Sequence, residues 1–221
     1  MEAKFPRTFI DLNRSHLELD PRLISGDFRF DKTARNMAGM GVIPRISGNG
    51  KEIYSKPIFA KDAIKRLESF YFPYHSYLYN LLLESKKRLG YAVLFDCHSM
   101  PSKLNLEFSN SKYNNDPDII LGDLNGTSCS SFLVSEVKAV FEKHNFFVTK
   151  NHPFSGGYIT KQYGNPSDAI HVIQIEINKK LYMDENSIKK NKNFENFRIK
   201  LTSVIEELSN LYPIRKKIAA E

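Results

Sequence analysis

The sequence predicts an α/β fold in which a mostly parallel mixed sheet lies between two layers of helices. Two observations lead to this class. Short apolar segments of the kind found in buried strands alternate with longer segments that carry apolar residues at helical spacing. No internal repeat interrupts the alternation. We therefore expect one domain over residues 1–221, with a three-layer α/β/α architecture.

The predicted elements follow one another along most of the chain. A first strand is expected at residues 8–12, and a Gly-rich loop follows at 39–50. A long helix over 60–89 ends before Gly90, and Pro73 should kink it because proline lacks the amide donor for the preceding turn. The later elements are a strand at 91–97, a helix at 130–144, strands at 146–149 and 171–177, and a helix at 194–211.

The composition of the sequence indicates the cellular compartment in which we expect the protein. Hydrophobic residues make up 41% of the chain, enough for a substantial core, and no stretch approaches the ~20 apolar residues that span a bilayer. Two cysteines are too few for a disulfide framework, and the N-terminus lacks the apolar segment of a secretory signal. We expect a cytoplasmic protein with free thiols and no membrane partner.

The net charge of +7 raises nucleic-acid binding as an alternative. Much of the excess lies in scattered lysines and in two late clusters, at residues 189–192 and 215–217. Neither cluster is part of a motif in which basic and aromatic residues are interleaved. A solvated helix face explains such runs better, so we expect no nucleic-acid partner.

Polar residues interrupt or follow the predicted strands, and ligands of α/β sheets gather beyond the strand ends. In the strand that begins at residue 91, Asp96 and His98 point to one face and Cys97 to the other. This alternation argues against a Cys97–His98 nucleophilic pair and favours Cys97 as a small buried hydrophobe. It suits His98 as a metal ligand, with Asp96 ordering the site or binding as well. A core histidine with a satisfied hydrogen bond is the alternative.

Two further positions have both a functional and a structural interpretation. Glu176 interrupts an apolar strand and shares its face with Gln174. A buried carboxylate is costly unless it activates water beside a metal or forms a structural salt bridge.

Arg14, which follows Asn13, offers a planar fork that pairs with a carboxylate through two hydrogen bonds. An arginine after a strand is more often an ordinary surface residue.

These residues form part of a longer pattern that resembles the N-formylglutamate amidohydrolase family. The matching segments occur in collinear order through most of the chain, and so many in order are highly specific. They are residues 11–14 (DLNR), 41–45 (GVIPR), 74–75 (YH), 96–101 (DCHSMP), 118–123 (DIILGD), 156–160 (GGYIT), 163–166 (YGNP), 174–178 (QIEIN) and 181–185 (LYMDE).

The resemblance implies a phosphorylase/hydrolase-like fold, shared with the zinc carboxypeptidases. It also implies hydrolysis of an N-formyl or similar N-acyl group from an acidic amino acid, with zinc or another divalent metal. In carboxypeptidase-like sites a His-Ser pair ends a strand and its histidine binds zinc, which His98-Ser99 resembles. An Asn-Arg pair there grips the substrate carboxylate, which Asn13-Arg14 resembles. Glu176 matches the late glutamate that serves as general base.

Two aromatic positions within this pattern have more than one interpretation. Tyr158 follows two glycines in an expected flexible loop and is a candidate to close over the substrate, with simple packing as the alternative. His75 lies inside a helical stretch, so we expect a core or helix-surface role for it rather than a catalytic one.

The sequence departs from the family pattern in one important respect. Family members usually carry an upstream segment with a Pro-His-x-Gly motif and a following acidic residue, which we expect to supply two metal ligands. A catalytic zinc normally has three protein ligands and a water, so His98 with Asp96 is an incomplete set. A smaller departure is Lys179, where relatives often have arginine.

We therefore expect an N-terminally incomplete domain. Two functions follow from this expectation. The chain is either a zinc amidohydrolase completed by a separate upstream fragment, or a non-catalytic member that keeps the fold and a carboxylate-binding pocket.

Overall fold

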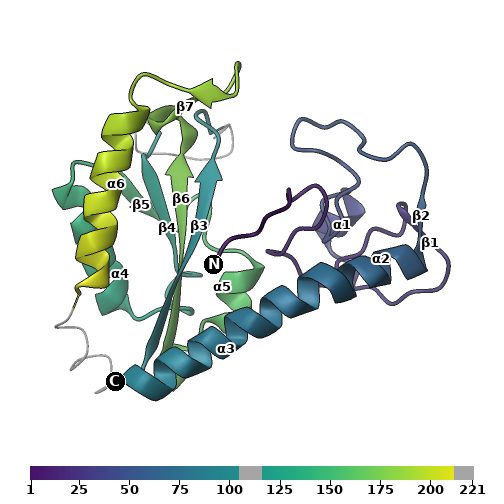
Figure 1. Ribbon diagram of the computed structural model, residues 1–221, viewed down its shortest axis with the longest axis horizontal. Coiled ribbons are helices and arrows are strands. Elements are labelled where there is room, and N and C mark those ends of the chain that lie inside the picture. The colour runs from purple at the N-terminus through teal and green to yellow at the C-terminus, as the bar shows by residue number, and fades with distance from the viewer. Residues whose placement is uncertain (105–115, 212–221) are drawn as a thin grey trace. The chain divides into compact units, whose positions relative to one another are not determined.

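The computed structural model describes residues 1–104 and 116–211, which divide into two compact units (Figure 1). The first unit consists of Met1–Glu84 with Gly157–Ile159, and the second of Ser85–Gly156 with the chain from Thr160 onward. Each unit has its own cluster of buried apolar side chains. The expectation of a single domain stays a prediction.

Four strands of the second unit form a mixed sheet in the order β3-β6-β4-β5. Strand β3 (Ala92–Met100) is parallel to β6 (Ile170–Asn178), and β4 (Ile119–Gly122) is parallel to β5 (Val148–Lys150). Strands β4 and β6 are antiparallel. The expected mixed, mostly parallel sheet is therefore confirmed.

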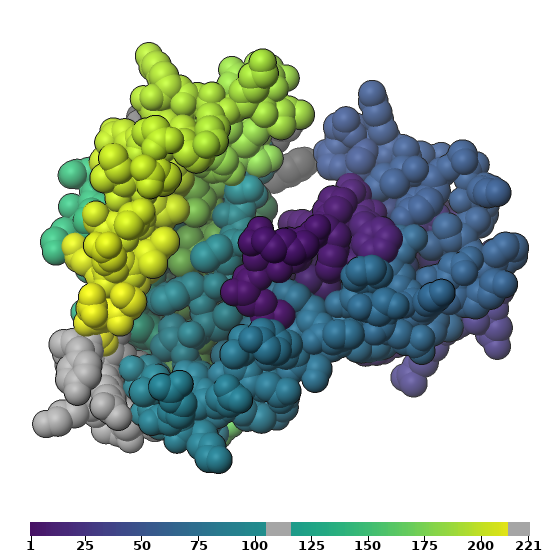
Figure 2. All heavy atoms as spheres, viewed as in Figure 1, coloured from purple at the N-terminus to yellow at the C-terminus, as the bar shows by residue number. Residues whose placement is uncertain are grey.

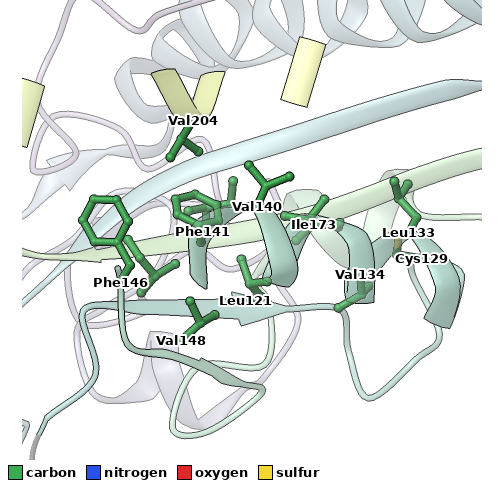
Figure 3. Close-up of a cluster of buried hydrophobic side chains, with 13 residues drawn as sticks. Leu121, Cys129, Leu133, Val134, Val140, Phe141, Phe146, Val148, Ile173 and Val204 are labelled. Atoms are coloured by element: carbon green, nitrogen blue, oxygen red, sulfur yellow. The ribbon is translucent and has the colours of Figure 1, made fainter. Parts of the chain in front are cut away.

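Helices lie on both sides of this sheet (Figure 1). Helices α4 (Ser131–Lys143) and α6 (Phe194–Ser209) cover one side, and the Thr160–Tyr163 part of α5 (Tyr158–Tyr163) lies on the other. Strand and helix side chains interlock in a buried core beneath α4 and α6 (Figure 3), which includes Leu121, Val134, Phe141, Ile173 and Val204. The expected α/β class is confirmed.

Strands β3, β5 and β6 and helices α4 and α6 of the second unit lie close to their predicted positions, whereas α5, β4 and several short elements are absent from the prediction. Strand β4 is absent from the prediction, although the run Ile119-Ile120-Leu121 has the β-branched, apolar character of a buried strand. The remaining elements are short: 3-10 helices at Pro166–Asp168 and Lys179–Leu181, and strands β7 (Met183–Asp184) and β8 (Lys189–Lys190). Of the two basic clusters, the first begins in β8, and residues 215–217 lie outside the described residues.

A long helical segment begins in the first unit and confirms the helix predicted over 60–89. Helix α2 (Ala60–Arg66) continues through a π turn at Leu67–Tyr71 into α3 (Phe72–Leu89). Within the π turn, the amide of Phe72 donates to the carbonyl of Leu67. Pro73, next in the chain, has no amide hydrogen to donate, and the irregularity expected around it takes the form of this wider turn.

The predicted first strand, at residues 8–12, is wrong. The amide of Phe9 donates to the carbonyl of Pro6 and closes a turn, and Asp11 donates to Val42 without a ladder that continues on either side. Ile10 and Leu12 are buried in the core of this unit from an irregular segment. Their alternation with polar residues is the pattern expected of a strand. An irregular segment shows the same pattern when, as here, it buries every second side chain.

The rest of the first unit is held by short elements and aromatic contacts. Strands β1 (Ile24–Ser25) and β2 (Ile58–Phe59) are parallel, and helix α1 (Ala34–Met37) is capped by Thr33. The N-terminal segment, purple in Figure 2, lies against the blue surface of the long helix. There the rings of Phe5 and Phe9 pack edge-on against Phe70, with centroids 5.3 and 5.1 Å away.

Throughout the described ranges, no helix has both the length and the apolar character needed to cross a membrane.

Candidate active site

The strand pair β3–β6 brings together the candidate catalytic residues of the second unit. His98 lies opposite Glu176, and Asp96 lies opposite Gln174. Neighbours across a parallel pair point to the same side of the sheet, so these four side chains share one face. The buried core beneath α4 and α6 packs against the other face.

Asp96 and His98 contact each other directly. Oδ2 of Asp96 lies 2.9 Å from Nε2 of His98, and the two side chains are only 10% and 16% exposed. A carboxylate that accepts a hydrogen bond from one ring nitrogen fixes the ring orientation and leaves the lone pair on the other nitrogen. The contact therefore suits Asp96 as the residue that orders His98.

Cys97 and Ser99 point to the face opposite His98, as strand alternation requires. Cys97 is exposed, so its expected burial is wrong; the buried free thiol is that of Cys129. The pKa of the Cys97 thiol is raised, because nearby protein atoms partly desolvate it and because Asp96 carries negative charge. A thiol with a raised pKa is a poor nucleophile, in agreement with the prediction against a Cys97–His98 pair.

Glu176 is buried, with 9% of its surface exposed. Its Oε1 accepts a hydrogen bond of 2.9 Å from the side-chain amide of Gln174. The carbonyl oxygen Oε1 of Gln174 is itself buried and has no hydrogen-bond partner in the part of the chain that the structure describes. A buried acceptor of this kind is suited to receive a donor from a bound water or ligand.

The donor chemistry of this face suits zinc, but the number of donors falls short. Imidazole nitrogen and carboxylate oxygen are both zinc ligands, and a catalytic zinc usually takes three from the protein. Asp96 and His98 supply two. Within residues 1–104 and 116–211, no three His, Cys, Asp or Glu side chains cluster as a metal ion would require.

In the first unit, the side chain of Asn13 is fixed by the first turn of α5. Its Oδ1 accepts from the backbone amide of Ile159 at 2.7 Å, and the backbone amide of Asn13 donates to Oδ1 of Asp11 at 3.0 Å. A Cβ atom at Gly157 would lie about 2.5 Å from the Asn13 side chain, closer than any real contact. Only glycine therefore allows this approach.

The guanidinium of Arg14 is folded back among acceptors. Nη1 donates to the carbonyl of Asn13 at 2.8 Å, and Nε donates to Met40 at 3.3 Å. The carboxylates of Asp11 and Glu18 lie 3.9 and 4.0 Å from Nε. Burial lowers the pKa of Arg14, and the charge of Asp11 opposes this change.

Tyr158 is the first residue of α5, so the expected position in a flexible loop is wrong. Its side chain packs against the apolar core of the first unit. The ring lies edge-on to His75, with centroids 5.7 Å apart.

The sequence-predicted residues thus form two groups, one within each unit. Asp96, His98 and Glu176 share a sheet face, and Asn13 and Arg14 share a loop. Sequence reasoning missed Tyr71, which contacts that loop from the π turn. The signal that could have revealed it is the spacing of Tyr71 and His75, four residues apart on one helix face.

These features define an α/β protein whose polar residues gather on one face of two parallel strands. The chain belongs to the N-formylglutamate amidohydrolase family, whose model matches residues 1–183.

Individual relatives agree with this assignment. The N-formylglutamate deformylases of Pseudomonas putida and Pseudomonas aeruginosa are 31% identical over 186 residues and 29% identical over 190 residues. These alignments cover 83% and 85% of this chain, but 63% and 65% of the relatives, so the chain spans slightly less than two thirds of their length. The crystal structure of N-formylglutamate amidohydrolase from Ralstonia eutropha JMP134 is similar, with a TM-score of 0.86 and 27% identity. That match covers 95% of this chain and 76% of the other.

Proposed function

We propose that this chain takes part in hydrolysis of the amide bond of N-formyl-L-glutamate or a related N-acyl amino acid. The products would be formate and the free amino acid. The names of the relatives support this substrate class. The observation that carries the proposal is the placement of buried Glu176 beside His98 on one sheet face.

Glu176 is the general base of this proposal. Its carboxylate would take a proton from the water that attacks the formyl carbon and would pass that proton to the departing amine. The hydrogen bond from Gln174 holds one carboxylate oxygen in place. A fixed carboxylate loses less freedom in the transition state than a mobile one, which favours the reaction.

His98 is the proposed metal ligand, and Asp96 either orders its ring or binds as a second ligand. Zinc or another divalent ion bound there would polarise the formyl carbonyl. Because the two residues fall one short of a usual set, a third ligand would have to come from another segment or chain. A separate upstream fragment is the partner we propose for that role.

Asn13, Arg14 and Tyr158 are the proposed substrate-binding residues of the first unit. Arg14 would pair with a substrate carboxylate through its planar fork, and Tyr158 would lie against the bound molecule. Ser99 is proposed from the family pattern alone, since its side chain lies on the sheet face opposite His98.

The proposal is tested by measuring binding and hydrolysis separately, with zinc present. N-formyl-L-glutamate should bind to the 221-residue chain. Formate release should become measurable when the chain is supplied with the part of the Pseudomonas putida relative that lies outside the alignment, fused or as a separate chain. Absence of binding and of formate release in both forms would overturn the proposal.

The second candidate is a binding protein without turnover, which would use the Arg14 loop of the first unit and would need no metal ion. Such a protein would bind N-formyl-L-glutamate through Arg14 but would release no formate, even when the additional segment restores stoichiometric zinc. That result would assign the chain a carboxylate-binding role and exclude catalysis.

A further inference from the structure

The backbone of residues 12–14 is held by two aromatic side chains of the long helix. The hydroxyl of Tyr71 donates to the carbonyl of Arg14 at 2.7 Å. Nε2 of His75 lies 3.0 Å from the carbonyl of Leu12. These two carbonyls lie on either side of Asn13 in the sequence. The helix therefore holds the backbone both before and after Asn13, next to Arg14.

The helix presents these two groups together. Tyr71 ends the π turn and His75 follows four residues later, which places both on one face of the helix. Their rings lie against each other, with centroids 4.2 Å apart and planes inclined by 40°. Tyr71 is 2% exposed, so its hydroxyl needs a partner, and the Arg14 carbonyl provides one.

The chemistry of His75 defines the direction of its hydrogen bond. Burial lowers its pKa to about 4, and the charge of His16 adds to the effect, so the ring is neutral at neutral pH. A neutral imidazole has one N–H, and because a carbonyl only accepts, the proton facing Leu12 belongs on Nε2. The same ring supports the edge of Tyr158.

We propose that His75, with Tyr71, is a positioning residue for carboxylate recognition. It holds the backbone of residues 12–14 so that the Arg14 guanidinium meets the substrate carboxylate, and it orients the Tyr158 ring. His75 would not touch the substrate. This inference rests on the proposed role of Arg14, and it assigns a role to a histidine for which the sequence indicated only packing.

A double-mutant cycle in the 221-residue chain tests it, with binding of N-formyl-L-glutamate measured by calorimetry. His75→Phe keeps an aromatic ring and removes the donor, and should weaken binding by about tenfold, the usual consequence of one lost hydrogen bond. Arg14→Ala should weaken binding by about 30-fold or more. In the Arg14→Ala background, His75→Phe should change binding by less than about twofold, because residues that act through one another are not additive.

Two further variants separate positioning from general structure. His75→Gln keeps an amide donor and should recover most of the affinity, and Tyr71→Phe, which removes only the hydroxyl, should be coupled to Arg14 in the same way. Tyr71→Phe decides the question if His75→Phe does not fold. The control is His144→Phe, at a half-buried helix-end histidine whose partner is Glu207, and it should leave binding unchanged.

Each other outcome contradicts the inference. Additive effects of His75→Phe and Arg14→Ala would show that His75 acts independently of Arg14. If folded His75→Phe and Tyr71→Phe bind N-formyl-L-glutamate as the parent chain does, while Arg14→Ala binds it weakly, the positioning role is overturned and the role of Arg14 is not. Unchanged binding in Arg14→Ala would overturn the proposed role of Arg14, and the inference would fall with it, whereas the proposed hydrolysis would still depend on its own test of binding and formate release.

Discussion

From Ile173 to Ile177, the side chains of β6 alternate between apolar packing and polar contacts. Ile173 and Ile175 belong to the buried core, and Ile177 packs against it. Gln174 and Glu176 point to the face shared with Asp96 and His98. A shift of register by one residue would exchange the two sets, so the core packing also fixes where the candidate catalytic groups lie.

Substitution of Glu176 tests the general base. In the form of the protein that releases formate, Glu176→Gln keeps the shape and removes proton transfer, so kcat should fall by roughly 10²–10⁴-fold. Binding of N-formyl-L-glutamate should change little. The matched control is Glu142→Gln, at an exposed glutamate of α4 that pairs with Lys138. A Glu176→Gln variant with near-normal formate release would indicate that Glu176 has a structural role.

His75 predicts a specific pH dependence of stability. Its pKa in the folded chain, about 4, lies below its ordinary value of 6.5. The folded state therefore disfavours the protonated ring, so stability is full above about pH 6.5 and is lost as the pH falls toward 4. Between pH 7 and 4, urea midpoints should fall more steeply for the parent chain than for His75→Phe. Parallel pH profiles for the two proteins would contradict this expectation.

At the scale of secondary structure, local hydrogen bonds fix where a helix begins and where it becomes irregular. Helix α4 begins at Ser131 and is capped by Ser130, whose side chain accepts from the amide of Leu133 at 3.3 Å. The long helix changes to a π turn at Leu67–Tyr71, which ends two residues before Pro73. Tyr71, which ends this turn, and His75 contact the carbonyls of Arg14 and Leu12.

Removal of the α4 cap should have a measurable cost. Ser130→Ala leaves one amide of the first helical turn without its partner and should lower the free energy of unfolding by about 1 kcal/mol. Ser131→Ala, one position further along, changes an exposed residue and should alter stability by less than about 0.5 kcal/mol. Denaturant unfolding of the three proteins measures both values. Equal stabilities for Ser130→Ala and the parent would show that the cap contributes nothing.

At the scale of the whole molecule, the candidate residues are divided between two compact units. The sheet unit holds the proposed base and metal ligand, and the first unit holds the proposed carboxylate-binding loop. Each group is supported by the core of its own unit, which allows binding and hydrolysis to be tested by separate substitutions.

The zinc content of the purified chain gives a prediction at the scale of the whole molecule. With His98 and Asp96 as the donors on the candidate face, the 221-residue chain should retain well under one zinc per chain after dialysis, because two ligands hold the ion weakly. His98→Ala should remove most of what remains, and His144→Ala should not. Elemental analysis measures all three. Stoichiometric zinc in His98→Ala would show that the metal binds elsewhere.

The sequence alone determined those features that depend on local periodicity. It predicted α4, α6 and most strands of the four-stranded sheet, the helix over 60–89, and the shared face of Asp96 and His98. Spacing in a strand or helix defines which side chains share a face before any long-range contact forms.

Tertiary structure alone decided features that depend on distant partners. Residues 8–12 have the alternation of a strand, but no neighbouring strand pairs with them, so they stay irregular. The antiparallel pairing of β4 with β6 and the exposure of Cys97 likewise follow from the sheet as assembled. His75 meets the carbonyl of Leu12 across 63 positions of sequence. A periodic sequence pattern indicates which side chains share a face of one helix or strand. Which other element packs against that face depends on the tertiary structure of the whole unit.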